Sequence, residues 1–122
     1  MQSPKPYREE RPWGEELWIT DEKPSMVKVL TVKAGEALSL QYHHHRDEYW
    51  HVLSGDGGAV IGEQTITLSP GMDCFVPRET KHRLTGGSSA LVVLELSFGD
   101  VDEKDIVRLE DKYGRTDPSS SR

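Results

Sequence analysis

The chain has 122 residues, of which 30% are charged, and its formal net charge is -6 at pH 7. This length suffices for one buried core, so we expect one domain, and the negative charge argues against nucleic acid as a partner. The single cysteine, Cys74, excludes an internal disulfide, and the sequence contains no apolar run long enough for a membrane helix or signal peptide, so we expect no membrane contact and a cytoplasmic location.

The two ends of the chain differ from its middle. Residues 1–12 contain three prolines and many charges, and residues 116–122 are polar. Segments of this composition bury little apolar surface. We therefore expect a flexible N-terminal arm over residues 1–12, a single domain over residues 13–115 and a disordered tail over residues 116–122.

The middle of the chain consists of short runs rich in Val, Leu, Ile and Thr, separated by Gly, Pro or Asp. This pattern is typical of an antiparallel all-β domain, and alternation over residues 26–32 leaves both faces partly apolar, as in the wall of a sandwich or barrel. The predicted strands are Glu16–Thr20, Met26–Val32, Leu38–His44, Glu48–Ser54, Gly58–Ile61, Gln64–Leu68, Asp73–Val76, His82–Thr85 and Leu91–Ser97.

The segment 102–113 allows two interpretations. Ile106, Leu109 and Tyr113 have the spacing of one face of a helix. The same segment could be an extended arm that crosses the barrel. The fold class is therefore all-β with a short C-terminal arm or helix.

Four of the five histidines fall within the nine residues 43–51. Side chains two apart in a strand point to the same face, so Gln41, His43 and His45 should share one face and Tyr42 the other. That face would offer an amide oxygen and two imidazoles, which is typical of a metal site.

Two further residues can complete such a site. Glu48 opens the next predicted strand and would return beside the histidines in a hairpin, while His82 would enter from another strand. Nitrogen and oxygen ligands without thiolate suit Zn, Mn, Fe, Co or Ni, so the ligand types do not select one metal. His44 and His51 are not expected to bind it.

The spacing of these residues resembles two motifs of the cupin superfamily. The first is Gly35-x5-Gln41-x-His43-x4-Glu48-x6-Gly55, with Gln41 in place of the usual histidine, and the second is Gly71-x5-Pro77-x-Glu79-x2-His82, with Glu79 in place of the usual glycine. The resemblance implies a cupin barrel, that is, a double-stranded β-helix or jelly roll. It also implies one divalent metal ion, zinc first, bound by Gln41, His43, Glu48 and His82.

A narrower resemblance covers residues 11–115. The segments 11–14, 38–48 and 105–115 are similar to the type II mannose-6-phosphate isomerase domain at the C-terminus of bifunctional mannose-1-phosphate guanylyltransferase/mannose-6-phosphate isomerase proteins. This sequence has no counterpart of their nucleotidyltransferase domain, so we do not expect nucleotide-sugar synthesis. The resemblance implies a metal-dependent isomerase that converts mannose 6-phosphate to fructose 6-phosphate, and a homodimer formed through edge strands and N-terminal arms.

Such an isomerase moves a proton between C1 and C2 while the metal stabilises negative charge on oxygen. His45, beyond His43 on the predicted ligand face, is the first candidate for the base or for an extra ligand, and Glu79 is the second. The phosphate and the sugar need further residues. The candidates are Arg46, Lys81 and Arg83, with Arg115 from the tail, for the phosphate, and Trp50 and Tyr42 for the sugar.

Two other functions are compatible with a cupin site. A metal-dependent dioxygenase would need iron with an open coordination position, and Gln41 in place of a third histidine disfavours it. A non-catalytic sugar-binding cupin would use the metal only structurally or not at all. Dioxygen uptake identifies the first alternative, and absence of turnover by fully metallated protein identifies the second.

Overall fold

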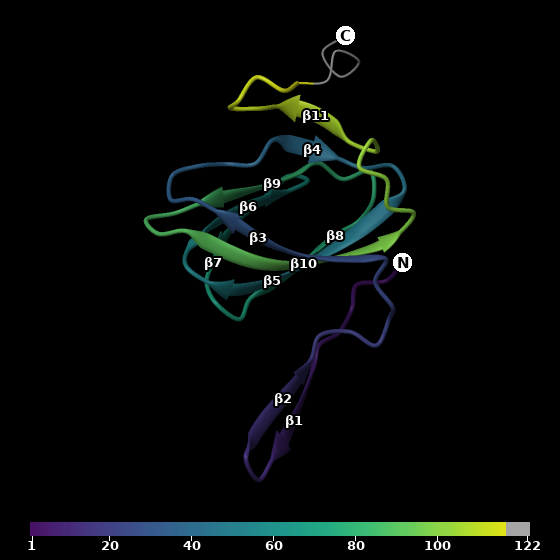
Figure 1. The fold of residues 1–122 in the computed structure, drawn as a ribbon, viewed down its shortest axis with the longest axis vertical. Helices are drawn as coiled ribbons and strands as arrows, with labels where there is room; N and C mark the ends of the chain where they lie inside the picture. Colours follow the sequence, from purple (N-terminus) through teal and green to yellow (C-terminus); the bar gives the residue numbers. More distant parts are fainter. Residues whose placement is uncertain (117–122) are drawn as a thin grey trace.

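The structure, a computed structural model, describes residues 1–116. Within this range the protein has eleven strands and no helix, which confirms the all-β prediction (Figure 1). The predicted disorder of the tail concerns residues that lie, apart from Thr116, outside the described range. The strands are β1 (Tyr7–Arg11), β2 (Gly14–Trp18), β3 (Met26–Val32), β4 (Leu40–Tyr42), β5 (Arg46–Ser54), β6 (Gly57–Ile61), β7 (Gln64–Leu68), β8 (Asp73–Val76), β9 (His82–Gly86), β10 (Leu91–Gly99) and β11 (Val107–Glu110).

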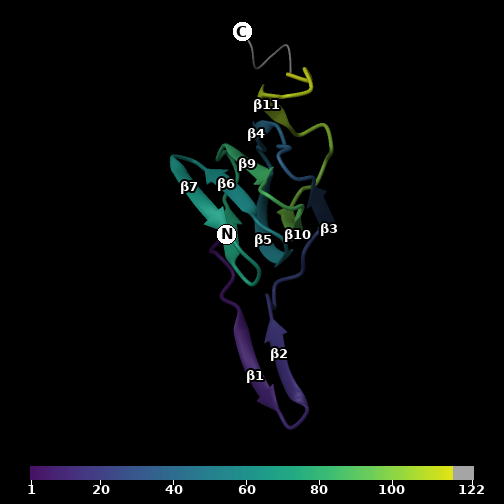
Figure 2. The same ribbon diagram turned by 90° about the vertical axis from the view of Figure 1, so that its left-hand side faces the viewer.

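Two antiparallel sheets form the barrel (Figures 1 and 2). One has the order β3-β10-β5-β8 and the other the order β11-β4-β9-β6-β7. Strands distant in the chain are therefore neighbours: Leu94 of β10 pairs with Val29 on one side and His51 on the other. This is the predicted jelly-roll arrangement, in which the inner faces of both sheets contribute to one interior.

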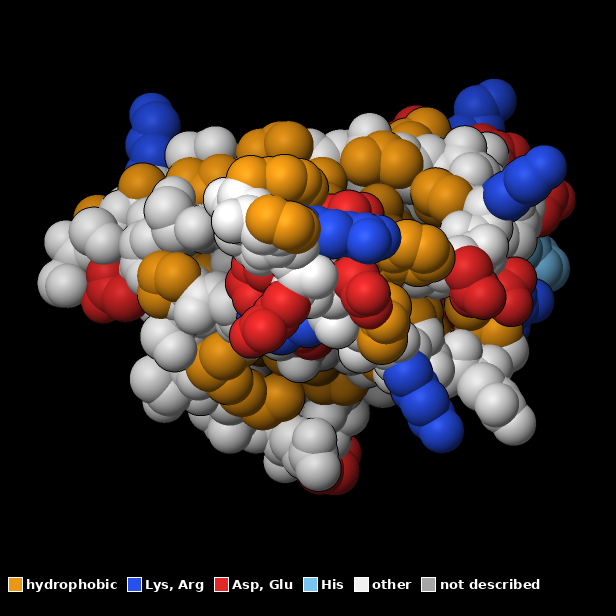
Figure 3. Space-filling view, turned by 90° about the horizontal axis from the view of Figure 1, so that it is seen from below, with side chains coloured by type: hydrophobic (Ala, Val, Ile, Leu, Met, Phe, Trp, Pro, Cys, Tyr) orange, Lys and Arg blue, Asp and Glu red, His pale blue; other side chains and the backbone are white. Residues whose placement is uncertain are grey.

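The N-terminal segment forms a hairpin that projects from the barrel (Figures 1 and 2). Residues 7–11, expected to belong to a flexible arm, form β1 and pair along their whole length with β2, and the expected boundary between residues 12 and 13 falls at the hairpin turn. The rings of Tyr7 and Trp18 meet edge to face with centroids 5.7 Å apart. Both rings and Trp13 are exposed, and hydrophobic side chains lie among charged ones on this side of the molecule (Figure 3).

The C-terminal segment is extended. Strand β11 pairs with β4, with Val107 opposite Tyr42 and Arg108 opposite Gln41, so the extended-arm interpretation is confirmed and the helical one is wrong. The physical reason is non-local: β4 would otherwise be an unpaired sheet edge, and β11 supplies its hydrogen-bonding partners. Of the three apolar residues whose spacing suggested a helix, Leu109 and Tyr113 are exposed and Ile106 is partly buried.

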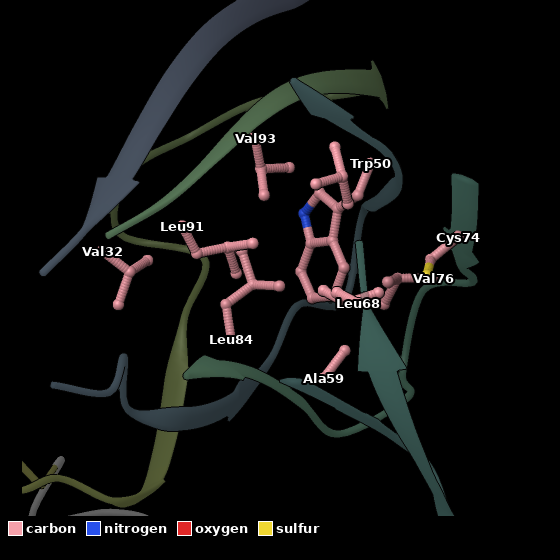
Figure 4. Packing of buried hydrophobic residues seen from close by; sticks show 10 residues of the cluster. Val32, Trp50, Ala59, Leu68, Cys74, Val76, Leu84, Leu91 and Val93 are labelled. Carbon is pink, nitrogen blue, oxygen red and sulfur yellow. The ribbon is translucent and has the colours of Figure 1, made fainter. Parts of the chain in front are cut away.

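The hydrophobic core lies between the two sheets (Figure 4). Leu84 and Leu91, from opposite sheets, are completely buried. Burying a side chain of this size contributes about 1.5–3 kcal/mol relative to exposure. The cluster consists of Val32, Trp50, Val52, Ala59, Leu68, Cys74, Val76, Leu84, Leu91 and Val93.

The turn after β5 requires glycine. Gly55 has φ +86°, and a Cβ atom there would lie 1.7 Å from the carbonyl oxygen of Ala90. Any larger residue would therefore be strained and would collide with the neighbouring backbone. This explains the final glycine of the first motif.

Each predicted strand overlaps an observed one, and the differences lie at the strand ends. Three predictions coincide with β3, β7 and β8. The predicted strand Leu38–His44 is too long, because β4 covers only Leu40–Tyr42.

No helix that could cross a membrane occurs in the part of the chain that the structure covers.

Candidate functional site

Three buried side chains converge inside the barrel. His43 directly follows β4, Glu48 lies in β5 and His82 begins β9, so the group draws on both sheets. Their potential ligand atoms all lie within 4.8 Å of one another. The Nε2 atom of His82 is 3.1 Å from Glu48 Oε1, and that of His43 is 3.7 Å from Glu48 Oε2.

Backbone carbonyls orient both imidazoles. The Nδ1 of His43 donates to the carbonyl oxygen of Asp105 at 2.6 Å, and the Nδ1 of His82 donates to that of Thr80 at 2.8 Å. The lone pair of His82 Nε2 is therefore directed towards Glu48, and that of His43 Nε2 faces both Glu48 and Nη2 of Arg46, which donates to it at 3.1 Å. Fixing the outer ring nitrogen in this way is what metal-binding histidines normally require.

The group contains buried polar atoms that lack hydrogen-bond partners in the described part of the chain and that a cation could bind. Among residues 1–116, neither Glu48 Oε1 nor His82 Nε2 has a hydrogen-bond partner, although both atoms are buried. Lone pairs that face each other without a cation are costly in a low-dielectric interior. A divalent metal ion satisfies the nitrogen and oxygen donors together, so the three residues fit such an ion.

The electrostatics of the group favour the metal-binding protonation states. Burial lowers the pKa of His43, which keeps its ring neutral. Burial alone would raise the pKa of Glu48, but His82, His43 and Arg46 outweigh that effect and lower it. The carboxylate therefore stays ionised, and the His43 ring beside it stays neutral, as coordination requires.

The fourth predicted ligand lies nearby. Gln41 of β4 is opposite His82 in the sheet register, and its side chain lines the same internal cavity as His43 and Glu48. Its coordination of the metal stays a prediction.

The cavity beside the group has a volume of about 190 Å³ and a strongly charged lining. A small polar molecule fits such a space better than an apolar one. Its charged lining consists of the positively charged residues Lys28, Arg46, Arg108 and Arg115 and the negatively charged residues Glu48, Glu95 and Glu103.

Arg46 lies deeper than the sequence suggested. It was expected at the mouth of the cavity, yet its side chain is only 6% exposed, with Nη2 3.1 Å from His43 Nε2 and Nε 3.4 Å from Glu48 Oε2. The reason is the pleat of β5, which places Arg46, Glu48 and Trp50 on one face. Within the described chain, Nε and Nη1 of Arg46 lack hydrogen-bond partners.

Of the other predicted phosphate ligands, Arg115 lines the cavity, whereas Lys81 and Arg83 point away from it. The Nζ of Lys81 lies 3.1 Å from Glu63, and Arg83 donates from Nε to the carbonyl oxygen of Leu38 at 2.9 Å. Both flank His82, whose side chain points inward, so alternation directs them outward. The structure does not bring them to the metal group.

The two predicted bases also lie outside the cavity. His45 is exposed, because β4 ends at Tyr42 and strand alternation does not extend to it. The backbone N–H groups of His44 and His45 instead donate to the Asp105 carboxylate at 2.9 Å, which holds a turn. Glu79 is exposed as well.

Glu79 has a structural role of its own. Its φ is +67°, in the region that favours glycine, which explains why the resembled motif usually has glycine at this position. Its N–H donates to the carbonyl oxygen of His43 at 2.7 Å and so joins the two motifs. The carboxylate lies 3.4 Å from Nδ1 of His44.

Of the two aromatic candidates, only one faces the cavity. Trp50 is buried, lines the cavity and lies with its ring centroid 5.6 Å from that of His82. Tyr42 lies on the opposite side of β4 from Gln41 and packs against His44. His51 lies outside the metal group and pairs with Asp73 at 2.6 Å.

Two cavity residues, Glu95 and Lys28, escaped the sequence interpretation. Glu95 of β10 is buried, accepts a hydrogen bond from Trp50 Nε1 at 2.9 Å, and has its pKa raised by burial and by Glu48. A signal existed: Leu91, Val93 and Glu95 share a face, so a charged residue follows two inward apolar ones. Lys28 likewise lies on the same face of β3 as the inward apolar residues of that strand.

With this geometry established, the comparisons with known proteins decide the family. Residues 5–111 match the family model described as "Mannose-6-phosphate isomerase C-terminal". The chain belongs to this family. The family resemblance inferred from the motifs is therefore confirmed, and so is the cupin fold.

Curated relatives of this mannose-6-phosphate isomerase C-terminal family include much longer proteins. The xanthan biosynthesis protein XanB of Xanthomonas campestris is 43% identical over 87% of this chain and 23% of its own length. The alginate biosynthesis protein AlgA of Pseudomonas aeruginosa is 41% identical over 87% of this chain and 22% of its own. The mannose-1-phosphate guanylyltransferase RfbM of Salmonella typhimurium is 42% identical over 85% and 22%, respectively. The chain thus spans less than a quarter of each.

Solved structures similar to this family member share its fold. A dTDP-4-dehydrorhamnose 3,5-epimerase from Elizabethkingia anophelis has a TM-score of 0.71 at 14% identity, covering 85% of this chain and 72% of that one. A cupin protein from Bacteroides fragilis has a TM-score of 0.58 at 18% identity, covering 70% and 78%. These similarities establish the cupin architecture alone.

Proposed function

We propose that the protein is a metal-dependent aldose-ketose isomerase of a sugar phosphate, with mannose 6-phosphate and fructose 6-phosphate as its substrate pair. One observation carries the proposal: the buried group of His43, Glu48 and His82 lies beside a cavity whose lining contains four basic side chains as well as three acidic ones. A metal site beside basic side chains suits a phosphorylated sugar. Membership of the mannose-6-phosphate isomerase C-terminal family supports the same substrate.

Bound to His43, Glu48, His82 and Gln41, a divalent ion, zinc first, would supply a Lewis acid that stabilises negative charge on the sugar oxygens. The chain itself must supply the group that moves the proton between C2 and C1. We assign this role to Glu95 rather than to His45 or Glu79, because Glu95 lines the cavity and the other two are exposed. The indole of Trp50 holds one oxygen of Glu95 and so directs the carboxyl group.

We also propose that the protein is a homodimer. The support is the exposure of Tyr7, Trp13 and Trp18 on the projecting hairpin, together with Val27 and Val29 on the outer face of edge strand β3. Exposed apolar side chains and a free strand edge favour association with a second copy. Analytical ultracentrifugation with and without the hairpin substitution Trp13→Ser tests this proposal.

The test of the isomerase is a coupled assay for fructose 6-phosphate formed from mannose 6-phosphate, on protein whose metal content is known from elemental analysis. We expect turnover that a chelator removes and that Zn, Co or Mn restores. A fully metallated protein without turnover contradicts the proposal and favours a sugar-binding cupin. Dioxygen uptake by iron-loaded protein would instead indicate a dioxygenase.

A further inference from the structure

Two basic side chains reach the cavity from different strands of one sheet. Lys28 of β3 lies opposite Glu95 of β10, which in turn lies opposite Trp50 of β5. Arg46 is at the start of β5, on the same pleated face as Trp50. Both basic side chains therefore line the cavity beside the metal group.

A single carboxylate from outside the sheet contacts both cations. Oε1 of Glu103, in the connection between β10 and β11, lies 3.2 Å from Lys28 Nζ and 3.8 Å from Arg46 Nη1. The Glu103 side chain is 68% exposed, whereas that of Arg46 is 6% exposed. An exposed acid thus approaches a buried guanidinium whose Nε and Nη1 make no hydrogen bond to any residue from 1 to 116.

A buried guanidinium with unused donors needs an anion, and its planar fork suits the oxygens of a phosphate. Two other carboxylates lie near Arg46. Glu48 belongs to the metal group, and its negative charge would be shared with a bound metal ion. Glu95 lines the same cavity and accepts the hydrogen bond of Trp50. Within residues 1–116 only the exposed Glu103 forms an ion pair with both Lys28 and Arg46. A phosphomonoester dianion can replace Glu103 and also supply the missing acceptors.

We propose that Lys28 and Arg46 form the binding site for the phosphate group of the substrate, and that the Glu103 carboxylate occupies this site until the phosphate displaces it. The identity of the phosphate as part of a sugar rests on the proposed function; the affinity of the site for a phosphate dianion does not. This assignment replaces Lys81 and Arg83 as phosphate ligands.

The structure provides a matched control pair. Lys81 and Glu63 form an ion pair of 3.1 Å, close to the 3.2 Å of Lys28 and Glu103, but on the outer side of the barrel. Removing either lysine changes the net charge equally. If Lys28→Met and Lys81→Met differ in their affinity for phosphate, the difference is therefore due to the position of Lys28 in the cavity and not to the total charge of the protein.

The experiment is calorimetric titration of the metal-loaded full chain with inorganic phosphate and, separately, with mannose 6-phosphate. We expect Lys28→Met to weaken binding of both by about tenfold or more, as loss of a charge-assisted contact does, and Glu103→Gln to strengthen it, because the competing carboxylate is gone. Lys81→Met and Glu63→Gln should leave both affinities unchanged. Elemental analysis and thermal unfolding verify that each variant is metallated and folded.

The results separate this inference from the proposed function. Equal effects of Lys28→Met and Lys81→Met, or weaker phosphate binding by Glu103→Gln, would overturn the phosphate site even if the protein isomerises mannose 6-phosphate. The expected affinity pattern without any isomerase turnover would retain the phosphate site and contradict the proposed function. If Lys28→Met fails to fold, Lys28→Gln and Glu103→Gln carry the same test.

Discussion

The two ends of the barrel interior differ in polarity although the same strands build both. Along β5 the inward side chains change from Glu48 to Val52, and along β9 they change from His82 to Leu84. Strand β10 runs the other way, from Leu91 to Glu95. Because the strands are antiparallel, the charged residues gather at one end and the apolar ones at the other.

The apolar and the polar end of the interior therefore have different roles. The apolar end excludes water and stabilises the fold, in proportion to the apolar area that it buries. The polar end contains buried atoms without hydrogen-bond partners within residues 1–116, which disfavour folding in the metal-free protein. Alternation along a strand shows which side chains point inward; the change of polarity along those inward positions shows where a ligand belongs.

The largest expected effect is loss of the metal from the polar end. His82→Ala or His43→Ala should each abolish stoichiometric metal binding, because a three-residue group loses one of its buried donors. His51→Ala, whose imidazole pairs with Asp73, should retain it. Elemental analysis after dialysis measures the stoichiometry, and full occupancy in His82→Ala would show that the ligand set is wrong.

At the apolar end the expected effect is on stability. Leu84→Ala should lower the free energy of unfolding by about 2–5 kcal/mol, because it leaves a cavity in the core. Metal stoichiometry of the folded variant should not change. Urea denaturation measures the first quantity and elemental analysis the second; loss of metal from folded Leu84→Ala would contradict the division between the two ends.

Within the polar end, Glu95→Gln should affect catalysis without affecting the metal. The amide oxygen can still accept the hydrogen bond from Trp50, but it cannot carry a proton between carbon atoms. We expect kcat to fall by about 10²–10⁴, the usual share of general acid-base catalysis, with metal content unchanged. His45→Ala is the comparison variant. A larger loss of kcat in His45→Ala than in Glu95→Gln would indicate that His45, and not Glu95, is the base.

The smallest expected effect is the pH dependence of stability without metal. Burial holds the pKa of His43 below its ordinary value of 6.5, so the unfolded chain binds this proton first as pH falls. The free energy of unfolding should therefore decrease below about pH 6.5. Urea denaturation in chelator at several pH values measures it. The decrease should be smaller in His43→Gln, and an identical decrease in both proteins would contradict the assignment to His43.

The sequence predicted that the side chains of the metal group come together because their spacing follows strand geometry. His43 and Glu48 are separated by one turn, and the two motifs place His82 on another inward strand position. The same parity argument failed for His45, because it assumed that the strand continued beyond Tyr42. It was not applied to Arg46 or Glu95, which alternation from known inward neighbours would have placed correctly. Alternation did place Lys28 on one face with Leu30 and Val32, but that face was not connected to the site.

Alternation and motif spacing were enough to predict the all-β class, the family and the convergence of His43, Glu48 and His82. The end of β4 could not be predicted in this way, because it depends on Asp105, 60 residues along the chain from His45, whose carboxylate accepts hydrogen bonds from the N–H groups of the turn. The pairing of β11 with β4 and the approach of Glu103 to Arg46 were equally unpredictable. These features depend on partners distant in the chain, whose approach local patterns do not encode.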